Sequence, residues 1–456
     1  MALETYPPGP KGGALLGNLQ EYAREPLAFL ARCARDHGDV VRLRFPGFPP
    51  VYLLSNPNDI EQVLVTDNRN FDKDRDTRHA LRFLGDGLLT SEGSFWRRQR
   101  RLMQPAFHRE RVEAYAEVMV SYAERMLTGW RDGEVRDIHE EMMRLTLEIV
   151  ARCLFDADVA AEARDVGEAL DAVMEHSTEQ GAGALLSRVV PEAVPTPRNL
   201  RLRRAIRRLD EVVHRIIERR RASGEDPGDL LSMMLRAEDE DGKRMSDKQL
   251  KDEVLTIVTA GHETTALALS WTFFLLSEHP EVEAKLLEEL DNVLGGRAPA
   301  VGDLTQLRYA TAVVKESMRL YPPVWAIGRE ATEDCEVGGY QVPAGTQMFI
   351  SQWVVHRDGR LFEKPEAFRP ERWLDGSERE LPKFAYFPFG GGPRLCIGKP
   401  FAEMEAVLLL AAIARRFRLT AVAKRRPLPQ PSITLRPGGG VRITLEQRRT
   451  RSRLET

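Results

Sequence analysis

A glycine-rich loop with a single cysteine, Phe389 to Gly398, constrains the fold of this chain more than any other stretch. It reads Phe-Gly-Gly-Gly-Pro-Arg-Leu-Cys-Ile-Gly, so three consecutive glycines come shortly before Cys396. Glycine tolerates positive φ angles and lets a large flat group approach the backbone. Pro400 and an apolar run to Leu410 follow, which predicts a helix that begins just after the cysteine.

We expect Cys396 to bind a metal through its sulfur. A helix N-terminus carries roughly half a positive charge and unpaired N–H groups, which favour a thiolate and lower the cysteine pKa below its usual value of about 8.5. A thiolate is the form in which cysteine binds a haem iron. The alternative is a buried and unreactive cysteine in a turn, which is the commoner fate of a lone cysteine.

The loop also resembles the haem-binding loop of the haem-thiolate monooxygenases, the cytochrome P-450 superfamily. The residues that match that motif are Phe389, Gly390, Gly392, Arg394, Cys396 and Gly398. The resemblance implies that Cys396 is the axial ligand of the haem iron. It also implies that Phe389 packs near the sulfur and that Arg394 reaches a haem propionate.

The composition is that of an ordinary soluble globular protein, and the chain is long enough to bury a cofactor. The chain has 456 residues, of which 42% are hydrophobic and 30% charged, and a net charge of −3 that argues against nucleic acid as the main partner. Its four cysteines are far apart and show no CxxC or CxxCH spacing, which argues against a zinc site or a c-type haem. Few cysteines in a long chain fit a reducing compartment, so we expect a cytoplasmic protein.

No apolar run begins the chain, and nowhere do about 18 uncharged apolar residues follow one another. Residues 7–10 resemble the proline-rich hinge that follows the membrane anchor of microsomal relatives. We therefore expect a bacterial-type relative without an anchor, and favour this over a chain from which an anchor has been removed.

A second motif lies in a long helix that Ser246 opens with a capping box and that is predicted to run to about residue 277. Its middle, residues 260–265, reads Ala-Gly-His-Glu-Thr-Thr and resembles the family's acid–alcohol motif. The resemblance implies that Glu263 and Thr264 deliver protons. A small residue such as Ala260 or Gly261 would leave room for the cofactor. The alternative is that Thr264 only bonds back to the carbonyl four residues earlier.

Trp96 and Arg100 lie four residues apart in a basic stretch, and so on one side of a predicted helix. The ordinary interpretation of such a stretch is a solvated helix face. The pair also resembles the family's tryptophan and arginine that hold a haem propionate through a charge-assisted contact. The resemblance places Arg97, Arg98 and Arg101 near the proximal surface, where we expect them to dock an acidic electron donor.

Glu316 and Arg319 lie three residues apart in a helix predicted to end at Pro322. As an isolated surface pair they would contribute only about 0.3–0.5 kcal/mol. They resemble the family's Glu-x-x-Arg pattern, which Arg372 would complete. The resemblance implies a structural triad that holds the loop leading to the cysteine, and Trp373 stands where phenylalanine is commoner.

Helical patterns are predicted over 24–37, 57–65 and almost all of 110–220, and a mobile loop over 71–90. The resemblance implies that this loop covers the distal pocket. Hydrophobic alternation predicts a hairpin over 40–54, a strand from Val324 to Arg329, and hairpins within 339–350 and 433–445. The basic tail, 447–453, is predicted to be disordered.

The resemblance gives the strand after Pro323 a role at the site. It implies that Val324 and Ala326 border the substrate and that Arg329 reaches the haem propionates, although a lone arginine in a strand is more often a surface residue. Pocket residues of this family lie in variable loops, here within 71–90, 174–190 and 324–326.

These features together predict one domain over 1–456, mainly α with a small β-rich region from about 38–56, 324–352 and 430–446, that encloses a b-type haem. The predicted reaction inserts one atom of O2 into an apolar organic substrate, and the other atom leaves as water. The chain is too short for a fused reductase, so we expect a monomer that receives electrons from a ferredoxin or flavodoxin and its reductase.

Two alternatives remain at this stage. A peroxide-driven haem-thiolate enzyme is the nearer one, although such relatives usually lack the acid–alcohol pair. A non-enzymatic haem sensor or carrier is the more distant one. Fatty acids, terpenoids, steroids and polyketides all remain open as substrates.

Overall fold

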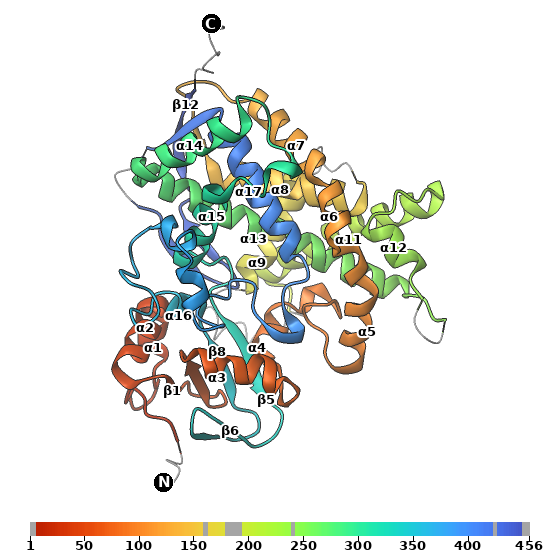
Figure 1. Ribbon diagram of the computed structural model, residues 1–456. Coiled ribbons are helices and arrows are strands. Elements are labelled where there is room, and N and C mark those ends of the chain that lie inside the picture. Colours follow the sequence, from red (N-terminus) through yellow and green to blue (C-terminus); the bar gives the residue numbers. More distant parts are fainter. Residues whose placement is uncertain (1–5, 158–162, 178–193, 239–241, 423–425, 449–456) are drawn as a thin grey trace, which may run out of the picture.

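The computed structural model describes residues 6–157, 163–177, 194–238, 242–422 and 426–448. Helices fill most of the molecule, and strands gather mainly at the end that holds the N-terminus (Figure 1). The helices are α1 (Leu19–Arg24), α2 (Pro26–His37), α3 (Pro57–Glu61), α4 (Arg75–Ala80), α5 (Gly93–Met103), α6 (Arg109–Ala114), α7 (Ala116–Thr128), α8 (Ile138–Phe155), α9 (Ala163–Ser177), α11 (Pro197–Ser223), α12 (Leu230–Arg236), α13 (Asp247–Glu278), α14 (Pro280–Leu294), α15 (Arg308–Leu320), α16 (Gln352–Val355) and α17 (Lys399–Ala414). The predicted fold class, mainly α with small sheets, is confirmed.

The largest sheet has five strands in the order β1-β2-β8-β5-β3. Its strands are β1 (Val40–Leu43), β2 (Val51–Leu54), β3 (Phe71–Lys73), β5 (Ile327–Ala331) and β8 (Gln347–Ile350). β2 and β8 run parallel, whereas the other neighbours run antiparallel, so two distant parts of the chain meet in one sheet. The predicted hairpin over 40–54 is confirmed by the β1–β2 pair.

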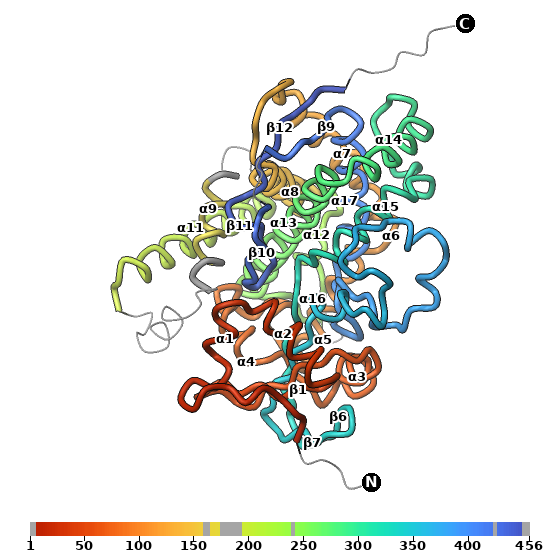
Figure 2. Tube along the Cα trace, turned by 90° about the vertical axis from the view of Figure 1, so that its left-hand side faces the viewer, coloured from red at the N-terminus to blue at the C-terminus, as the bar shows by residue number. Residues whose placement is uncertain are grey.

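Three smaller sheets complete the β structure. They are formed by β6 (Cys335–Val337) with β7 (Tyr340–Val342), by β10 (Leu428–Pro431) with β11 (Leu435–Gly438), and by β4 (Val135–Asp137), β12 (Arg442–Gln447) and β9 (Phe417–Ala421) in the order β4-β12-β9. The last of these lies at the opposite end of the molecule from the five-stranded sheet (Figures 1 and 2).

Both later hairpin predictions are wrong in their pairing. The predicted hairpin within 339–350 is instead β6 with β7, because Gly338 and Gly339 make the turn at positive φ, and β8 pairs with β5. Within 433–445, Gly439 and Gly440 carry the chain from one sheet to another, so β11 and β12 do not pair with each other. The predicted disorder of the tail is wrong for its first two residues. Gln447 ends β12, and the Arg448 N–H donates to the Arg416 carbonyl. The rest of the tail lies outside the described residues.

Helix α13 is the central element, surrounded by α8, α15 and α17 (Figures 1 and 2). The predicted capping box is confirmed, because Ser246 accepts the Gln249 N–H at 3.3 Å and Gln249 accepts the Ser246 N–H at 2.7 Å. More than two-thirds of its 32 residues are buried, and they lie on almost all sides of the helix. Near its C-terminal end, Trp271 stacks on Tyr321, the residue that follows α15, with ring centroids 4.0 Å apart.

The segment 71–90 differs from the predicted mobile loop. It contains β3 and α4, and its last part is bound to α13. Asp252 accepts the Asp86 N–H and Glu253 accepts the Leu88 N–H, both at 2.9 Å. Two acidic side chains of α13 therefore hold the backbone of this segment, which hydrophobic periodicity does not reveal.

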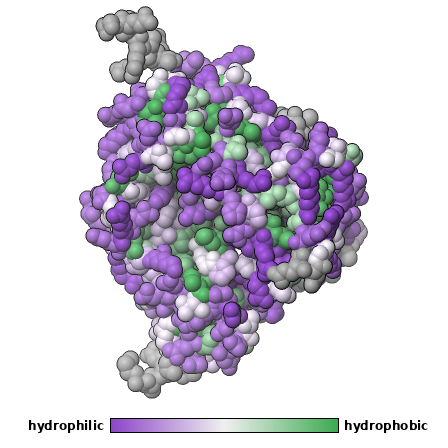
Figure 3. All heavy atoms as spheres, turned by 45° about the vertical axis from the view of Figure 1, so that its right-hand side comes forward, coloured by the Kyte–Doolittle hydropathy of each residue, from purple (hydrophilic) through white to green (hydrophobic). Residues whose placement is uncertain are grey.

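Hydrophilic residues cover most of the face seen in Figure 3, and apolar residues show only between them. Among the described helices, none combines the length and the apolar character that a bilayer span requires.

Candidate functional site

The cysteine loop is closed by a backbone hydrogen bond in which the Cys396 N–H donates to the Phe389 carbonyl at 3.0 Å. Gly390 and Gly392 adopt φ of 73° and 65°, conformations that other residues rarely adopt. Helix α17 begins at Lys399 with a proline in its first turn. The predicted placement of the sulfur at a helix N-terminus is confirmed.

The glycines of this loop are needed mainly because the protein itself approaches them. A Cβ on Gly391 would lie 2.3 Å from the Phe384 ring, and one on Gly392 would lie 1.9 Å from the Leu64 carbonyl oxygen. These two glycines therefore make room for other segments of the protein, a role that the sequence did not predict. Leu64 belongs to a turn of π-helix (Gln62–Thr66) that continues α3.

The Cys396 side chain is accessible. The N–H groups of Gly398 and Lys399 and the positive charge of Arg100 act on its sulfur. Although all three favour the thiolate, the surrounding protein removes enough water that burial raises the Cys396 pKa above its ordinary value. The predicted lowering of the pKa is wrong for the chain by itself, because desolvation outweighs the helix N-terminus.

Arg394 and Trp96 lie against each other. The guanidinium carbon of Arg394 lies 4.7 Å from the centroid of the Trp96 ring, and the same guanidinium donates to the Glu92 carboxylate. Its Nη1 is buried and has no acceptor among the described residues. Burial lowers the Arg394 pKa. The sequence did not point to Glu92, because a contact between a helix start and a loop 302 residues later leaves no local pattern.

Arg329 is buried in β5 and donates to the carbonyl of Gly328 at 2.8 Å. Its pKa is lowered to about 10, because burial disfavours the charged form more than Asp74 and Asp72 favour it. Among the residues that the structure describes, no carboxylate forms an ion pair with it. Arg329 is therefore a buried cation that an added anion would stabilise.

Lys73 is a further buried basic residue that sequence reasoning missed. It pairs with Arg329 across β3 and β5, and its Nζ donates to the carbonyls of Leu88 and Ser91 at 2.9 Å each. Its pKa is lowered to about 6, mainly by burial and also by the charges of Arg394 and Arg329. The structure thus places Lys73 within electrostatic range of both arginines.

On α13, Ala260 is exposed and Thr264 is partly exposed, whereas Thr259, His262 and Glu263 beside them are buried. The two accessible residues lie four apart and therefore on one side of the helix. A Cβ on Gly261 would instead lie 2.8 Å from the Val150 side chain of α8. Gly261 thus makes room for helix packing, a role that the sequence did not predict.

The Thr264 hydroxyl donates to the Ala260 carbonyl at 2.8 Å, which is the back-bond expected as the alternative. Glu263 points elsewhere: Arg436 and the Thr434 hydroxyl donate to its carboxylate at 2.7 and 2.8 Å. Arg436 also forms an ion pair with Asp171 of α9 at 3.0 Å. The structure does not join Glu263 to Thr264, and the two partners from the C-terminal segment were not predicted.

The Glu316 carboxylate contacts both Arg319 and Arg372 at 2.9 Å. The Trp373 indole also donates to it at 2.9 Å, so tryptophan at this position adds a hydrogen bond that phenylalanine cannot make. Arg319 is fully buried and donates to the backbone carbonyls of His356, Pro365 and Ala367. The three predicted residues therefore lie together and hold the segment that leads to the cysteine loop.

Val324 and Ala326 are partly exposed on either side of the buried Trp325, whose indole donates to the Ser432 carbonyl at 2.7 Å. Strand β5 begins only at Ile327, so the predicted strand starts three residues too early. Most of the predicted pocket loop 174–190 lies outside the described residues.

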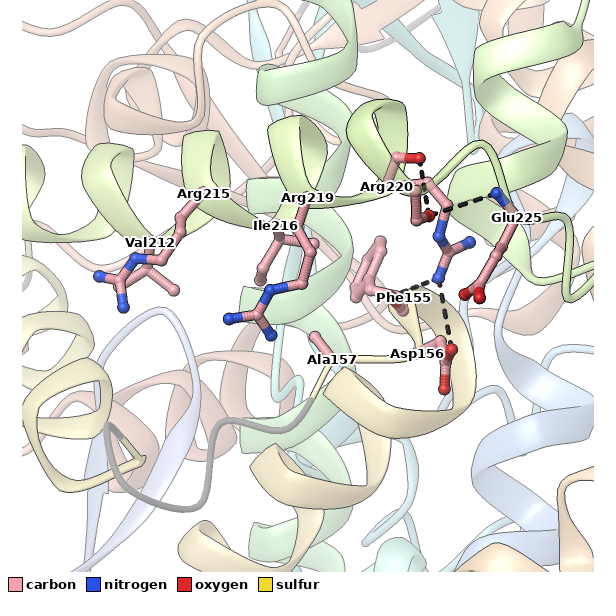
Figure 4. Close-up of a pocket in the computed structure, with 10 residues that line it drawn as sticks. Phe155, Asp156, Ala157, Val212, Arg215, Ile216, Arg219, Arg220 and Glu225 are labelled. Carbon is pink, nitrogen blue, oxygen red and sulfur yellow. Dashed lines mark hydrogen bonds and ion pairs between the residues drawn. The ribbon is translucent and has the colours of Figure 1, made fainter.

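A pocket of about 230 Å³ lies elsewhere, between the end of α8 and α11 (Figure 4). Its lining includes Phe155, Ile216 and the exposed Arg219. Arg220 beside it is bound to Asp229 at 2.7 Å. None of the predicted site residues lines this pocket.

The site thus combines an accessible cysteine at a helix N-terminus with the largely buried Arg394, one of whose donors has no acceptor among the described residues. A sequence profile of the family described as "Cytochrome P450" matches residues 7–442. Cyclooctatin synthase of Streptomyces melanosporofaciens is 42% identical over 94% of this chain and 93% of its own. Cyclooctat-9-en-7-ol 5-monooxygenase of the same organism is 39% identical over 91% and 88%, and pentalenene oxygenase of Streptomyces avermitilis is 36% identical over 92% and 93%. The chain belongs to the cytochrome P450 family and is a haem-dependent monooxygenase.

Proposed function

We propose that the chain binds a b-type haem through Cys396 and inserts one oxygen atom of O2 into an apolar cyclic substrate. The observation that carries this proposal is the accessible Cys396 thiol, with the N–H groups of Gly398 and Lys399 directed at it. Bound haem would supply the activation of dioxygen, which a thiolate ligand favours by promoting O–O cleavage.

The residues around the site fit the two carboxylates of a haem. Arg394 has a buried guanidinium nitrogen without an acceptor, and Arg329 is a buried cation without an ion pair among the described residues. Arg100 lies near enough to the sulfur for its charge to act on it, and Trp96 packs against Arg394. The three arginines would bind and neutralise the propionates, and Trp96 would hold Arg394 in place.

Thr264 and Glu263 would manage protons in different ways. The Thr264 proton is already donated to Ala260, so its oxygen can accept a hydrogen bond and hold a water beside the reacting oxygen. Glu263 is buried and bound to Arg436 and Thr434, so it would exchange protons with water only after it changes partners. We expect Thr264 to position water and Glu263 to supply protons through it.

For the substrate, the names of the relatives favour one class among the four that the sequence leaves open. They denote an unsaturated hydrocarbon, pentalenene, and an unsaturated cyclic alcohol. We propose a terpenoid hydrocarbon or its alcohol, bordered by Val324 and Ala326. A panel of terpenoids, fatty acids and steroids, titrated against the iron spin-state spectrum, tests this: saturable shifts only with fatty acids would refute it.

Electrons would come from a separate ferredoxin or flavodoxin that docks on α5. Arg97 and Arg101 are exposed there, whereas Arg98 is partly buried and donates to the Lys243 carbonyl at 2.9 Å, so it suits docking less. Reversing the charge of Arg97 should raise the partner concentration needed for half-maximal reduction, and the same change at Arg204, exposed on α11, should not.

Three measurements test the function itself. The reduced protein under carbon monoxide should show the spectrum of a thiolate-ligated haem, and an imidazole-type spectrum would refute Cys396 as the ligand. Thr264→Ala should keep haem but divert reducing equivalents to hydrogen peroxide, and unchanged coupling would remove Thr264 from the mechanism. Turnover with peroxide alone at the rate seen with reductant and O2 would instead favour a peroxide-driven enzyme.

A further inference from the structure

The two ends of the Arg394 guanidinium have different surroundings. Nη2 donates to Glu92, and both side chains are largely buried, with 16% and 15% of their surfaces exposed. Nη1 is buried and lacks an acceptor among the described residues. Because the guanidinium is planar and rigid, a contact that fixes one nitrogen also fixes the direction of the other. Glu92 and the Trp96 ring together determine where the open donor points.

Glu92 is itself held in place. It is the residue immediately before α5, yet its side chain makes no capping hydrogen bond to that helix. Its other carboxylate oxygen instead accepts the Lys73 N–H at 2.8 Å. The carboxylate therefore joins the start of α5, strand β3 and the cysteine loop, and the usual local role of an acidic residue at a helix start does not account for it.

The charges around Glu92 give it a second effect. The charges of Arg329 and Arg394 both act on Lys73, and Glu92 is the acid that directly contacts Arg394. Asp72 is farther from the same nitrogen, at 4.0 Å, and 43% exposed. A largely buried negative charge is screened less than an exposed one, so Glu92 contributes more to the local potential than Asp72 does.

We propose that Glu92 is a positioning residue for the haem: it holds Arg394 so that Nη1 faces a propionate, and its charge lowers the haem reduction potential. This rests on the proposed contact between Arg394 and a propionate. A carboxylate near the haem stabilises the more positively charged ferric state, because opposite charges attract. Glu92→Gln should therefore raise the potential and weaken the hold on haem.

The experiment uses the haem-loaded full chain and follows haem transfer to an excess of apomyoglobin. A charge-assisted hydrogen bond is about twice as strong as a neutral one, so we expect Glu92→Gln to release haem about five- to tenfold faster. Spectroelectrochemical titration should show a more positive potential. Asp72→Asn is the matched control and should change the haem release rate and the reduction potential less than Glu92→Gln does. Glu92→Asp keeps the charge, so its release rate and potential should lie between those of wild type and Glu92→Gln.

A double-mutant cycle separates this inference from the function on which it rests. If Glu92 acts through Arg394, Glu92→Gln should add little acceleration in an Arg394→Gln background. An equal acceleration in both backgrounds would overturn the positioning role, and an unchanged potential would overturn the electrostatic one. If Arg394→Gln alone leaves haem release unchanged, the propionate contact and the positioning role are both wrong, whereas the carbon monoxide spectrum would still report on Cys396 independently.

Discussion

Glu405 supports a quantitative prediction about pH and stability. It lies on α17, is fully buried, and neither of its carboxylate oxygens has a hydrogen-bond partner within normal distance among the described residues. Burial raises its pKa from 4.5 to about 8, although the nearby Thr265 hydroxyl opposes the shift. The carboxyl group is therefore neutral in the folded protein at pH 7 and ionised in the unfolded chain.

The sign follows from proton binding. Between about pH 4.5 and pH 8 the folded state binds the Glu405 proton and the unfolded state does not, so stability falls as pH rises through this window. Each pKa unit corresponds to about 1.36 kcal/mol, which gives an upper bound of about 5 kcal/mol at pH 9. We expect about 3–5 kcal/mol, because a charged Glu405 would draw in water. Below pH 4.5 the effect vanishes.

The perturbation is Glu405→Gln, which keeps the shape of the neutral carboxyl group and cannot ionise. Unfolding entropy of about 2.1 cal/mol/K per residue makes 1 kcal/mol worth about 1 °C in Tm for 456 residues. The Tm of the variant should match wild type at pH 5 and exceed it by about 3–5 °C at pH 9. Glu288→Gln, at an exposed position on α14, is the control and should follow wild type at both pH values. An equal Tm difference at pH 5 and pH 9 would refute a protonated Glu405.

Two further substitutions test the scaffold. Gly392→Ala places a Cβ 1.9 Å from the Leu64 carbonyl oxygen at a φ of 65°. We therefore expect at least about 2 kcal/mol of destabilisation and a smaller fraction of haem-loaded protein. Gly359→Ala, with open space around it, is the control and should leave the stability and the haem-loaded fraction unchanged. Glu316→Gln leaves the fully buried Arg319 without its counter-charge and should lower the free energy of unfolding by about 3–5 kcal/mol. The Tm should fall by several degrees. A Tm within about 1 °C of wild type would show that the backbone carbonyls alone hold this arginine.

The parts of the site that the sequence predicted are those that lie within short contiguous motifs. Cys396 at a helix N-terminus and the meeting of Glu316 with Arg319 depend on spacing along one segment, which a helix converts directly into neighbourhood. Glu92, Lys73 and Arg436 were missed because each reaches the site from a segment whose position depends on tertiary packing. A glutamate before a helix is ordinarily explained by that helix, so no local signal distinguished this one.

Strand positions followed from alternation, but strand partners did not. The run at 433–445 contains two strands separated by glycines, which is also what a hairpin would show. The two strands lie in different sheets: β11 pairs with β10, whereas β12 pairs with β9 over five residues and with β4 over three. Which strands pair depends on how the sheets assemble. A run of glycines is equally compatible with a tight turn inside a hairpin and with a connection from one sheet to another.

The electrostatics of the site are unfavourable in two opposite ways, and a single group relieves both. At the cysteine, burial raises the Cys396 pKa, so the thiolate needs a nearby positive centre. In the neighbouring segments, one Arg394 nitrogen is buried without an acceptor, and the buried Arg329 has no ion pair among the described residues, so both cations would be stabilised by anions. A macrocycle with a cationic iron at its middle and two carboxylates at its edge would supply both charges at once. If Cys396 and the two arginines bind haem as proposed, haem binding relieves both unfavourable interactions, and conservative changes at Cys396 or at either arginine should weaken haem binding.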